Sequence, residues 1–182
     1  EVKYLTLASR DNSQLDRLAR QIMRESGLAA RIASDLHLAL RRADVILTVT
    51  GSSTPLIEPE DLKSGAVVCD VARPRDVSLR VASERKDVLV IEGGVVQVPG
   101  NVEFNFNFGF PPHTAYACMA ETMILALEGR YESFTLGREI SVEQIETIVQ
   151  LAGKHGFRLA GLRSFERALT EEEVAEIRRR AS

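Results

Sequence analysis

The sequence predicts an α/β protein built around a doubly wound parallel sheet. Short runs of apolar and β-branched residues alternate, over residues 2–94, with segments whose apolar residues recur at helical spacing. Several of the runs are continuously apolar, which is typical of strands buried on both faces of a parallel sheet. Strands that alternate with helices form right-handed crossover units with helices on both faces of the sheet.

The expected elements follow one another in a regular order. Strands are expected at residues 2–9, 30–34, 44–51, 66–71 and 87–94. Between the first three lie helices at 11–26 and 35–43, of which the first carries a stripe of apolar residues and is capped by Asp11 or Asn12. The first half of the chain is therefore read as two consecutive strand–helix units followed by three further strands.

After residue 111 we expect helices and no further strands. An apolar helix is predicted over 114–129, opened by Thr114 after two prolines that end the preceding segment. Two more helices are announced by capping boxes, one formed by Ser141 with Gln144 and one by Thr170 with Glu173. These later helices are amphipathic or charged, so we expect them on the outside of the domain or against a partner.

The composition is that of a soluble globular protein. The chain has 182 residues, of which 45% are hydrophobic, and a formal net charge of −3. A mildly acidic balance speaks against a nucleic-acid partner. No apolar run reaches the roughly 18 residues of a transmembrane helix, so we expect no transmembrane segment and a cytoplasmic location. The two cysteines and three histidines lack the spacing of metal ligands, so we expect no metal site. The sequence is also compatible with a homo-oligomer.

No G-x-G-x-x-G motif occurs in the chain. A Rossmann-like domain normally opens with a strand, a glycine-rich turn and a helix that holds a pyrophosphate. We therefore expect residues 1–112 to be a partial NAD(P)-binding domain, whose first strand and glycine turn lie upstream. Residues 113–182 are expected to form a helical segment that packs on this domain and carries Cys118. The alternative is a domain that never had these parts and binds no nucleotide.

Two residues after the first strand predict the choice of cofactor. An enzyme that selects NAD usually places Asp or Glu there to accept a hydrogen bond from the ribose 2′-hydroxyl. This chain has Ser9 and Arg10, and a guanidinium suits a 2′-phosphate, so the residues favour NADP. The alternative is a solvated turn.

Further candidates for cofactor binding lie at the carboxyl ends of the strands expected at 44–51 and 87–94. Gly51 allows a close approach of the backbone to the nicotinamide ribose, and Thr50 and Ser52 offer hydroxyl donors. Gly93 and Gly94 lie at the carboxyl end of the strand expected at 87–94, where a ring could approach closely. Ligands of open α/β sheets collect at these carboxyl ends of strands, although either position can also be an ordinary turn.

The stretch ADVILTVTGSSTPLIEPEDLKSGAVVCDVARPRDVS resembles the dinucleotide-binding domains of shikimate and quinate dehydrogenases and of glutamyl-tRNA reductases. The D-x-A-x-P-R-D pattern of the latter is matched by Asp70, Ala72, Pro74, Arg75 and Asp76. Three other stretches, VLVIEGGVV, ACMAETMILALEGRYESFTLGR and KHGFR, are similar to the long-chain acyl-[acyl-carrier-protein] reductases.

The second resemblance implies a Rossmann domain that follows an acyl-binding domain, with Cys118 as the residue that takes the acyl group. The thioester would then be reduced by NADPH to an aldehyde. The chain departs from these reductases at Asp70-Val71-Ala72, where they carry D-G-G, and in its tail beyond Gly161.

The residues around Cys118 allow two interpretations. If Thr114 caps the helix, Cys118 lies at about the end of the first turn, where unpaired amides stabilise a thiolate, and His113 could assist as a base. Free cysteines are also among the most buried residue types, so Cys118 could equally be core. Two other functions remain open: a shikimate-, quinate- or amino-acid-type dehydrogenase without covalent catalysis, and a dinucleotide-binding module without chemistry.

Overall fold

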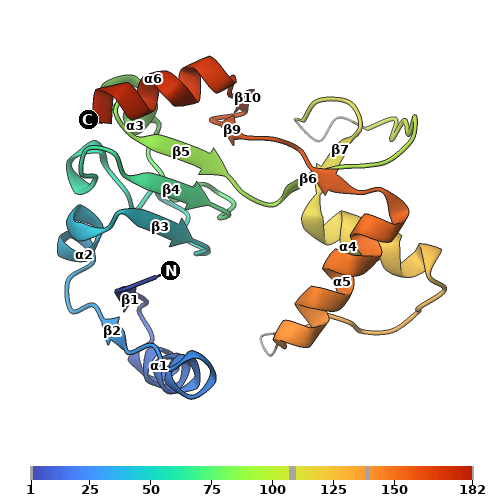
Figure 1. The fold of residues 1–182 in the computed structure, drawn as a ribbon, viewed down its shortest axis with the longest axis horizontal. Helices are drawn as coiled ribbons and strands as arrows, with labels where there is room; N and C mark the ends of the chain where they lie inside the picture. Colours follow the sequence, from blue (N-terminus) through green and yellow to red (C-terminus); the bar gives the residue numbers. More distant parts are fainter. Residues whose placement is uncertain (1, 107–109, 138–139, 182) are drawn as a thin grey trace.

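The computed structural model describes residues 2–106, 110–137 and 140–181. It confirms an α/β fold in which parallel strands alternate with helices (Figure 1). The first half of the chain contains β1 (Leu5–Leu7), α1 (Asn12–Ser26), β2 (Ala30–Ile32), α2 (Leu36–Arg42), β3 (Val45–Thr48), the short 3-10 helix η1 (Pro59–Asp61), β4 (Val67–Asp70), α3 (Leu79–Glu84) and β5 (Leu89–Glu92). All five strands expected in this half are present, each shorter than its apolar run.

The parallel strands form two separate sheets. β1 pairs with β2, while β3, β4 and β5 form a three-stranded sheet in that order. In the larger sheet Thr48 is the register partner of Asp70, and Asp70 of Glu92, so the last residues of the three strands lie in one row. Among the described residues, β1 and β3 each have one edge without a strand partner.

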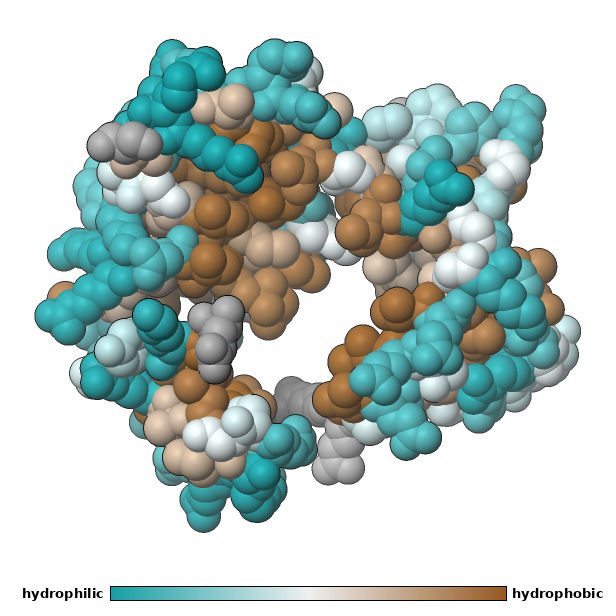
Figure 2. All heavy atoms as spheres, viewed as in Figure 1, coloured by the Kyte–Doolittle hydropathy of each residue, from teal (hydrophilic) through white to brown (hydrophobic). Residues whose placement is uncertain are grey.

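The larger sheet is covered on one face. Val68 and Val90 point into a core with Leu40 of α2 and Val81 of α3. On the opposite face of β3, Val45 is 70% exposed and Leu47 is 68% exposed. The expectation of burial on both faces is therefore wrong for this strand, because no described element covers its second face. Figure 2 shows apolar side chains gathered over this sheet, beside the opening that separates it from α5.

A second unit follows β5. β6 (Val95–Gln97) pairs antiparallel with β7 (Thr114–Tyr116) and with β8 (Arg158–Leu159), and this sheet packs on α4 (Ala117–Leu127) and α5 (Val142–His155). The expectation of no strands after residue 111 is therefore wrong. Residues 114–116 were predicted as the start of a helix. They are a strand because β6 supplies their backbone partners, and the helix begins only at Ala117.

The C-terminal residues return to the larger sheet. β9 (Arg163–Ser164) and β10 (Arg167–Ala168) form a hairpin that contacts β5, and α6 (Glu171–Ala181) follows, on the side of α3 in Figure 1. Both predicted capping boxes are present. The Ser141 hydroxyl accepts from the amide of Gln144 at 3.1 Å, and the Thr170 hydroxyl accepts from the amide of Glu173 at 3.2 Å.

Candidate functional site

The carboxyl ends of β3, β4 and β5 bring most of the predicted cofactor residues to one edge. Thr50, Gly51 and Ser52 follow β3, and Gly93 and Gly94 follow β5. Because the strands are parallel and in register, the loops after them open on the same side of the sheet. In open α/β sheets this is the side on which ligands bind.

The hydroxyl groups of Thr50 and Ser52, in the loop that follows β3, are engaged within the protein. Thr50 Oγ1 donates to Asp76 Oδ1 at 2.6 Å and accepts from the amide of Ser52 at 3.1 Å. Ser52 Oγ donates to the carbonyl of Thr54 at 2.7 Å. Gly51 between them is exposed, and a Cβ built on it would meet no atom within 4 Å. In this conformation the loop therefore offers a ligand its backbone at Gly51, since both hydroxyl protons are already donated inside the protein.

Two buried carboxylates shape the loop that follows β4. Asp70 accepts from the amides of Ala72 at 3.0 Å and Val77 at 3.1 Å. Burial raises the pKa of Asp70, while these two amide hydrogen bonds act in the opposite direction. Asp76 is fully buried and accepts from the hydroxyl of Thr48 as well as from Thr50. In the sequence Asp76 is visible only as part of the D-x-A-x-P-R-D pattern, because the threonines that it binds lie at and just after the end of β3.

A third buried carboxylate ties the same loop to the C-terminal hairpin. Glu92, at the end of β5, accepts from Arg75 Nε at 3.0 Å and from the amide of Glu166 at 3.0 Å. Arg75 also binds the Glu166 carboxylate at 2.7 Å and lies over the ring of Phe165, 5.9 Å from its centre. The Arg75 guanidinium is therefore held by the protein itself and joins the β4 loop to the hairpin.

The two glycines after β5 have structural reasons of their own. A Cβ on Gly93 would lie 2.6 Å from Cγ2 of Val71, and Gly94 has a φ of +77°, which side chains rarely adopt. The carbonyl of Gly94 accepts from the amide of Ala117 at 2.8 Å. This bond sets the first residue of α4 against the end of β5, next to the candidate cofactor edge.

Cys118 is exposed and is the second residue of α4. Its amide is thus among the first four of the helix, which lack a partner within the helix. It lines a cavity of about 660 Å³ together with Glu121 and Leu125 of α4 and with the segment 130–136. The Glu121 carboxylate accepts from the hydroxyl of Thr135 in this cavity. The core interpretation of Cys118 does not hold in this structure, since its side chain reaches solvent and a cavity.

Cys69 and His113 are less accessible than Cys118. Cys69, whose position in the apolar run 66–71 is typical of a core residue, is only half-buried on β4, because the second face of the sheet is incompletely covered. His113 has a φ of +60°, and its Nδ1 is buried without a hydrogen-bond partner in the described part of the chain. Its carbonyl accepts from the amide of Val98 at 2.8 Å.

Ser9 and Arg10 follow β1 and are both exposed. The Ser9 hydroxyl accepts from the amide of Asp11 at 3.3 Å. Asp11 caps α1 by accepting from the amide of Gln14, and the hydrogen bond from the Ser13 hydroxyl lowers the Asp11 pKa. Asp11, the first acidic residue after β1 in the sequence, is thus engaged as a helix cap, and Arg10 before it is exposed.

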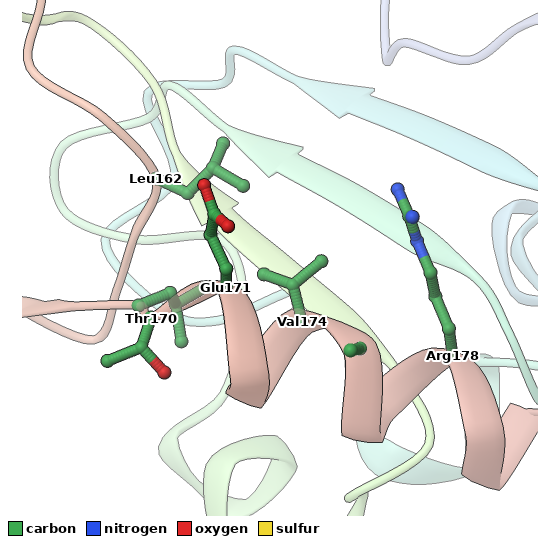
Figure 3. A pocket seen from close by; sticks show the side chains of 7 residues that line it. Leu162, Thr170, Glu171, Val174 and Arg178 are labelled. Carbon is green, nitrogen blue, oxygen red and sulfur yellow. The ribbon is translucent and has the colours of Figure 1, made fainter.

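A second cavity, of about 500 Å³, is lined only by residues of the C-terminal segment (Figure 3). Glu171, Val174 and Arg178 project from one side of α6 toward it, opposite Leu162. None of the predicted site residues line it. Within residues 2–106, 110–137 and 140–181, no group of three or more His, Cys, Asp or Glu side chains is placed to hold a metal. No helix in those ranges is long and apolar enough to cross a membrane.

Comparison with known proteins agrees with the motifs in the sequence. The chain is 34% identical over 151 residues to the aminotransferase PigE of a Serratia species, covering 81% of this chain and 18% of that protein. It is 31% identical over 162 residues to the long-chain acyl-[acyl-carrier-protein] reductase of Synechococcus elongatus, covering 85% of this chain and 45% of the reductase. It is 30% identical over 79 residues to the glutamyl-tRNA reductase of Methanocaldococcus jannaschii, covering 42% of this chain and 19% of that enzyme.

The chain thus spans less than half the length of these three relatives. The resemblances to acyl-[acyl-carrier-protein] reductases, glutamyl-tRNA reductases and shikimate dehydrogenases, first seen in short motifs, are confirmed by alignments of this length. The family model of the shikimate / quinate 5-dehydrogenases matches residues 1–92, which contain both parallel sheets and the loops that follow β3 and β4. Since this match covers half of its residues, the chain belongs to the shikimate / quinate 5-dehydrogenase family of oxidoreductases.

Proposed function

We propose that this chain is the nucleotide-binding and acyl-accepting part of an NADP-dependent reductase of acyl thioesters. The observation that carries the proposal is the position of Cys118. Its thiol is exposed at the start of α4, and the bond between Ala117 and Gly94 holds that start against the carboxyl end of β5. The similarity to an acyl-[acyl-carrier-protein] reductase, which includes this helix, supports the same reading.

An arginine that follows β1 is suited to the 2′-phosphate end of NADP. Arg10 is exposed after β1, and its planar guanidinium can bind a 2′-phosphate through two parallel hydrogen bonds. The backbone at Gly51 and the turn at Gly93 and Gly94 would contact the nicotinamide half. When bound, NADPH supplies the hydride that reduces the thioester carbonyl.

Cys118 performs the acyl transfer in this proposal. Its thiolate attacks the carbonyl of the acyl thioester, the carrier leaves as a thiol, and a thioester to Sγ of Cys118 remains. The exchange replaces one thiol by another of similar leaving ability, so it needs little driving force. After reduction, the thiohemiacetal on Cys118 breaks its C–S bond and releases the aldehyde and the free thiol. His113, five residues earlier, is proposed as the base that takes the proton of Sγ.

A segment that precedes β1 would complete the sheet. β1 and β3 each keep one free strand edge within the described residues, and Val45 and Leu47 of β3 are exposed although they are apolar. We infer that an upstream strand lies between β1 and β3 and pairs with both of them. We also infer that the acyl-binding domain belongs to the same upstream region. The enzyme acts in the cytoplasm in this proposal, on a small or carrier-bound acyl substrate.

The upstream strand can be tested by the accessibility of residue 47. A Leu47→Cys variant of the full-length protein should react slowly with a thiol reagent, while Leu159→Cys, at a position 85% exposed, should react rapidly. Equal rates would show that no segment covers β3.

The proposed reaction is tested with the full-length protein, a long-chain acyl thioester and NADPH, by measuring the aldehyde formed. Cys118→Ser should abolish aldehyde release, and Cys69→Ser should retain it. Aldehyde formation by Cys118→Ser at the rate of the unmodified enzyme would contradict covalent catalysis.

The family match favours a second candidate. The model of the shikimate / quinate 5-dehydrogenases covers both parallel sheets, which supports a dehydrogenase that would bind its cofactor at the same edge and would need no cysteine. NADP-dependent oxidation of shikimate or quinate, unaffected by Cys118→Ser, would favour this function over the first.

A further inference from the structure

Asp76 gathers the donors of the β3 loop on one buried carboxylate. The residue has no exposed surface. Its Oδ2 accepts from the Thr48 hydroxyl and from the amide of Thr50 at 3.2 Å, and its Oδ1 accepts from the Thr50 hydroxyl at 2.6 Å. All three donors belong to the end of β3 or the first residues after it, and none belongs to the loop that contains Asp76.

The backbone of Asp76 holds the far end of the same loop. Its carbonyl accepts from the amides of Leu56 at 2.7 Å and Ile57 at 2.9 Å. Side chain and main chain of one residue therefore fix both ends of the segment 49–55. Between these ends, the Thr50 hydroxyl accepts a hydrogen bond from the amide of Ser52 at 3.1 Å, so the backbone of Ser52 is also held through Asp76 and Thr50. Gly51, the exposed glycine of the segment, lies between Thr50 and Ser52.

The carboxylate oxygens of Asp76 set the direction of these hydrogen bonds. Both threonine hydroxyls donate to them, and Thr50 Oγ1 uses a lone pair to accept from the Ser52 amide. An asparagine at position 76 would present two N–H donors to a site that already supplies three. One of those contacts would then be lost, and the loop would gain alternative conformations.

We propose that Asp76 is a positioning residue for the cofactor: it holds the backbone around Gly51 in the conformation that receives the nicotinamide half of NADPH, without touching the cofactor itself. This inference rests on the proposed NADP site. When only a fraction of the molecules has the binding conformation, the apparent affinity for the ligand falls in proportion to that fraction. A variant in which this loop samples other conformations should therefore bind NADPH more weakly.

The test compares three variants of the full-length protein. Asp76→Asn removes the carboxylate, and Thr50→Val removes the hydroxyl that links Asp76 to Ser52 while leaving Asp76 in place. Asp61→Asn is the matched control, because Asp61 is also a buried carboxylate that accepts from a backbone amide, that of Glu58 at 3.1 Å, but it lies in η1, outside this loop.

NADPH binding is measured by fluorescence titration, and hydrogen exchange is followed over residues 49–55 in the absence of cofactor. Losing one hydrogen bond to a charged group should weaken NADPH binding about tenfold in Asp76→Asn. Thr50→Val should weaken it in the same direction. Both variants should speed exchange in the loop and raise KM for NADPH more than they lower kcat. Asp61→Asn should lower the melting temperature and leave NADPH affinity unchanged.

Two results overturn the inference and are distinguishable. If the unmodified protein binds NADPH and Thr50→Val and Asp76→Asn bind it equally well, Asp76 has no positioning role and the proposed function stands. If the unmodified protein binds no NADPH, the proposed function fails and the inference fails with it. Thr50→Val keeps the test decisive if Asp76→Asn does not fold.

Discussion

The amide of Ala117 donates a hydrogen bond to the carbonyl of Gly94 over 2.8 Å. Gly94 follows the last strand of the parallel sheet, and Ala117 is the first residue of α4. This backbone hydrogen bond therefore joins the carboxyl end of β5, which is part of the candidate cofactor edge, to the helix that carries Cys118. It brings the start of α4, more than twenty residues further along the chain, against the end of the parallel sheet.

Arg10 should set the choice between NADPH and NADH. In Arg10→Gln the 2′-phosphate loses its charged partner, and loss of such hydrogen bonds should raise KM for NADPH by about 10- to 100-fold. KM for NADH should change little, because NADH has no 2′-phosphate. Steady-state kinetics with both cofactors provides the measurement, and Arg20→Gln on the exposed surface of α1 is the control. An equal loss with both cofactors would argue against a phosphate contact.

Arg75 should be much more important for stability than Arg80, although both form several ion pairs. The Glu92 side chain is 1% exposed, so Arg75→Met leaves a buried carboxylate without its closest charged partner and should lower the free energy of unfolding by about 3 kcal/mol. Arg80 contacts Glu58, Glu60 and Glu84 at the surface, where its side chain is 52% exposed.

Arg80→Met should therefore cause a far smaller loss, because water screens exposed ion pairs. Urea unfolding of both variants gives the comparison. Equal losses would show that the Glu92 carboxylate is stabilised without Arg75.

Acid should weaken the contact between Arg85 and Asp87. The hydrogen bond from Arg85 lowers the pKa of Asp87 from 3.8 to about 2. A carboxyl group whose folded pKa is depressed stabilises the fold above its unfolded pKa and loses that contribution as the pH falls through the folded value. The loss should therefore occur between about pH 4 and pH 2, and should be on the order of 1 kcal/mol for a partly exposed pair.

Thermal unfolding measured across this pH range tests the expectation. Asp87→Asn should remove this part of the pH dependence, while Asp16→Asn, at an exposed position of α1, should leave it in place. An identical pH profile for Asp87→Asn and the unmodified protein would contradict the assignment.

The parallel strands could be predicted from the sequence because each is encoded locally. Apolar runs such as the two that contain Val68 and Val90 are recognisable without knowledge of their neighbours, and the caps Asp11 and Ser141 act within three residues. Boundaries were less accurate, since the polar residues at the end of each run belong to the loops.

The start of α4 and the role of Asp76 could not be predicted because both depend on distant partners. Thr114 resembles a helix cap in the local sequence, but its backbone pairs with Gln97 of β6. Asp76 is an ordinary loop aspartate until β3 brings Thr48 and Thr50 to it. The open face of β3 was also missed, because an apolar pattern indicates that a face is suited to burial and does not identify what covers it.

The most direct test of the account is the detection of an acyl group on Cys118. The full-length protein is incubated with a long-chain acyl thioester in the absence of NADPH, and the intact protein and its peptides are examined by mass spectrometry. The account predicts an acyl adduct on Cys118 that disappears, with release of aldehyde, when NADPH is added. An enzyme that forms aldehyde while no acyl group ever appears on Cys118, even when turnover is blocked by omitting NADPH, would contradict it.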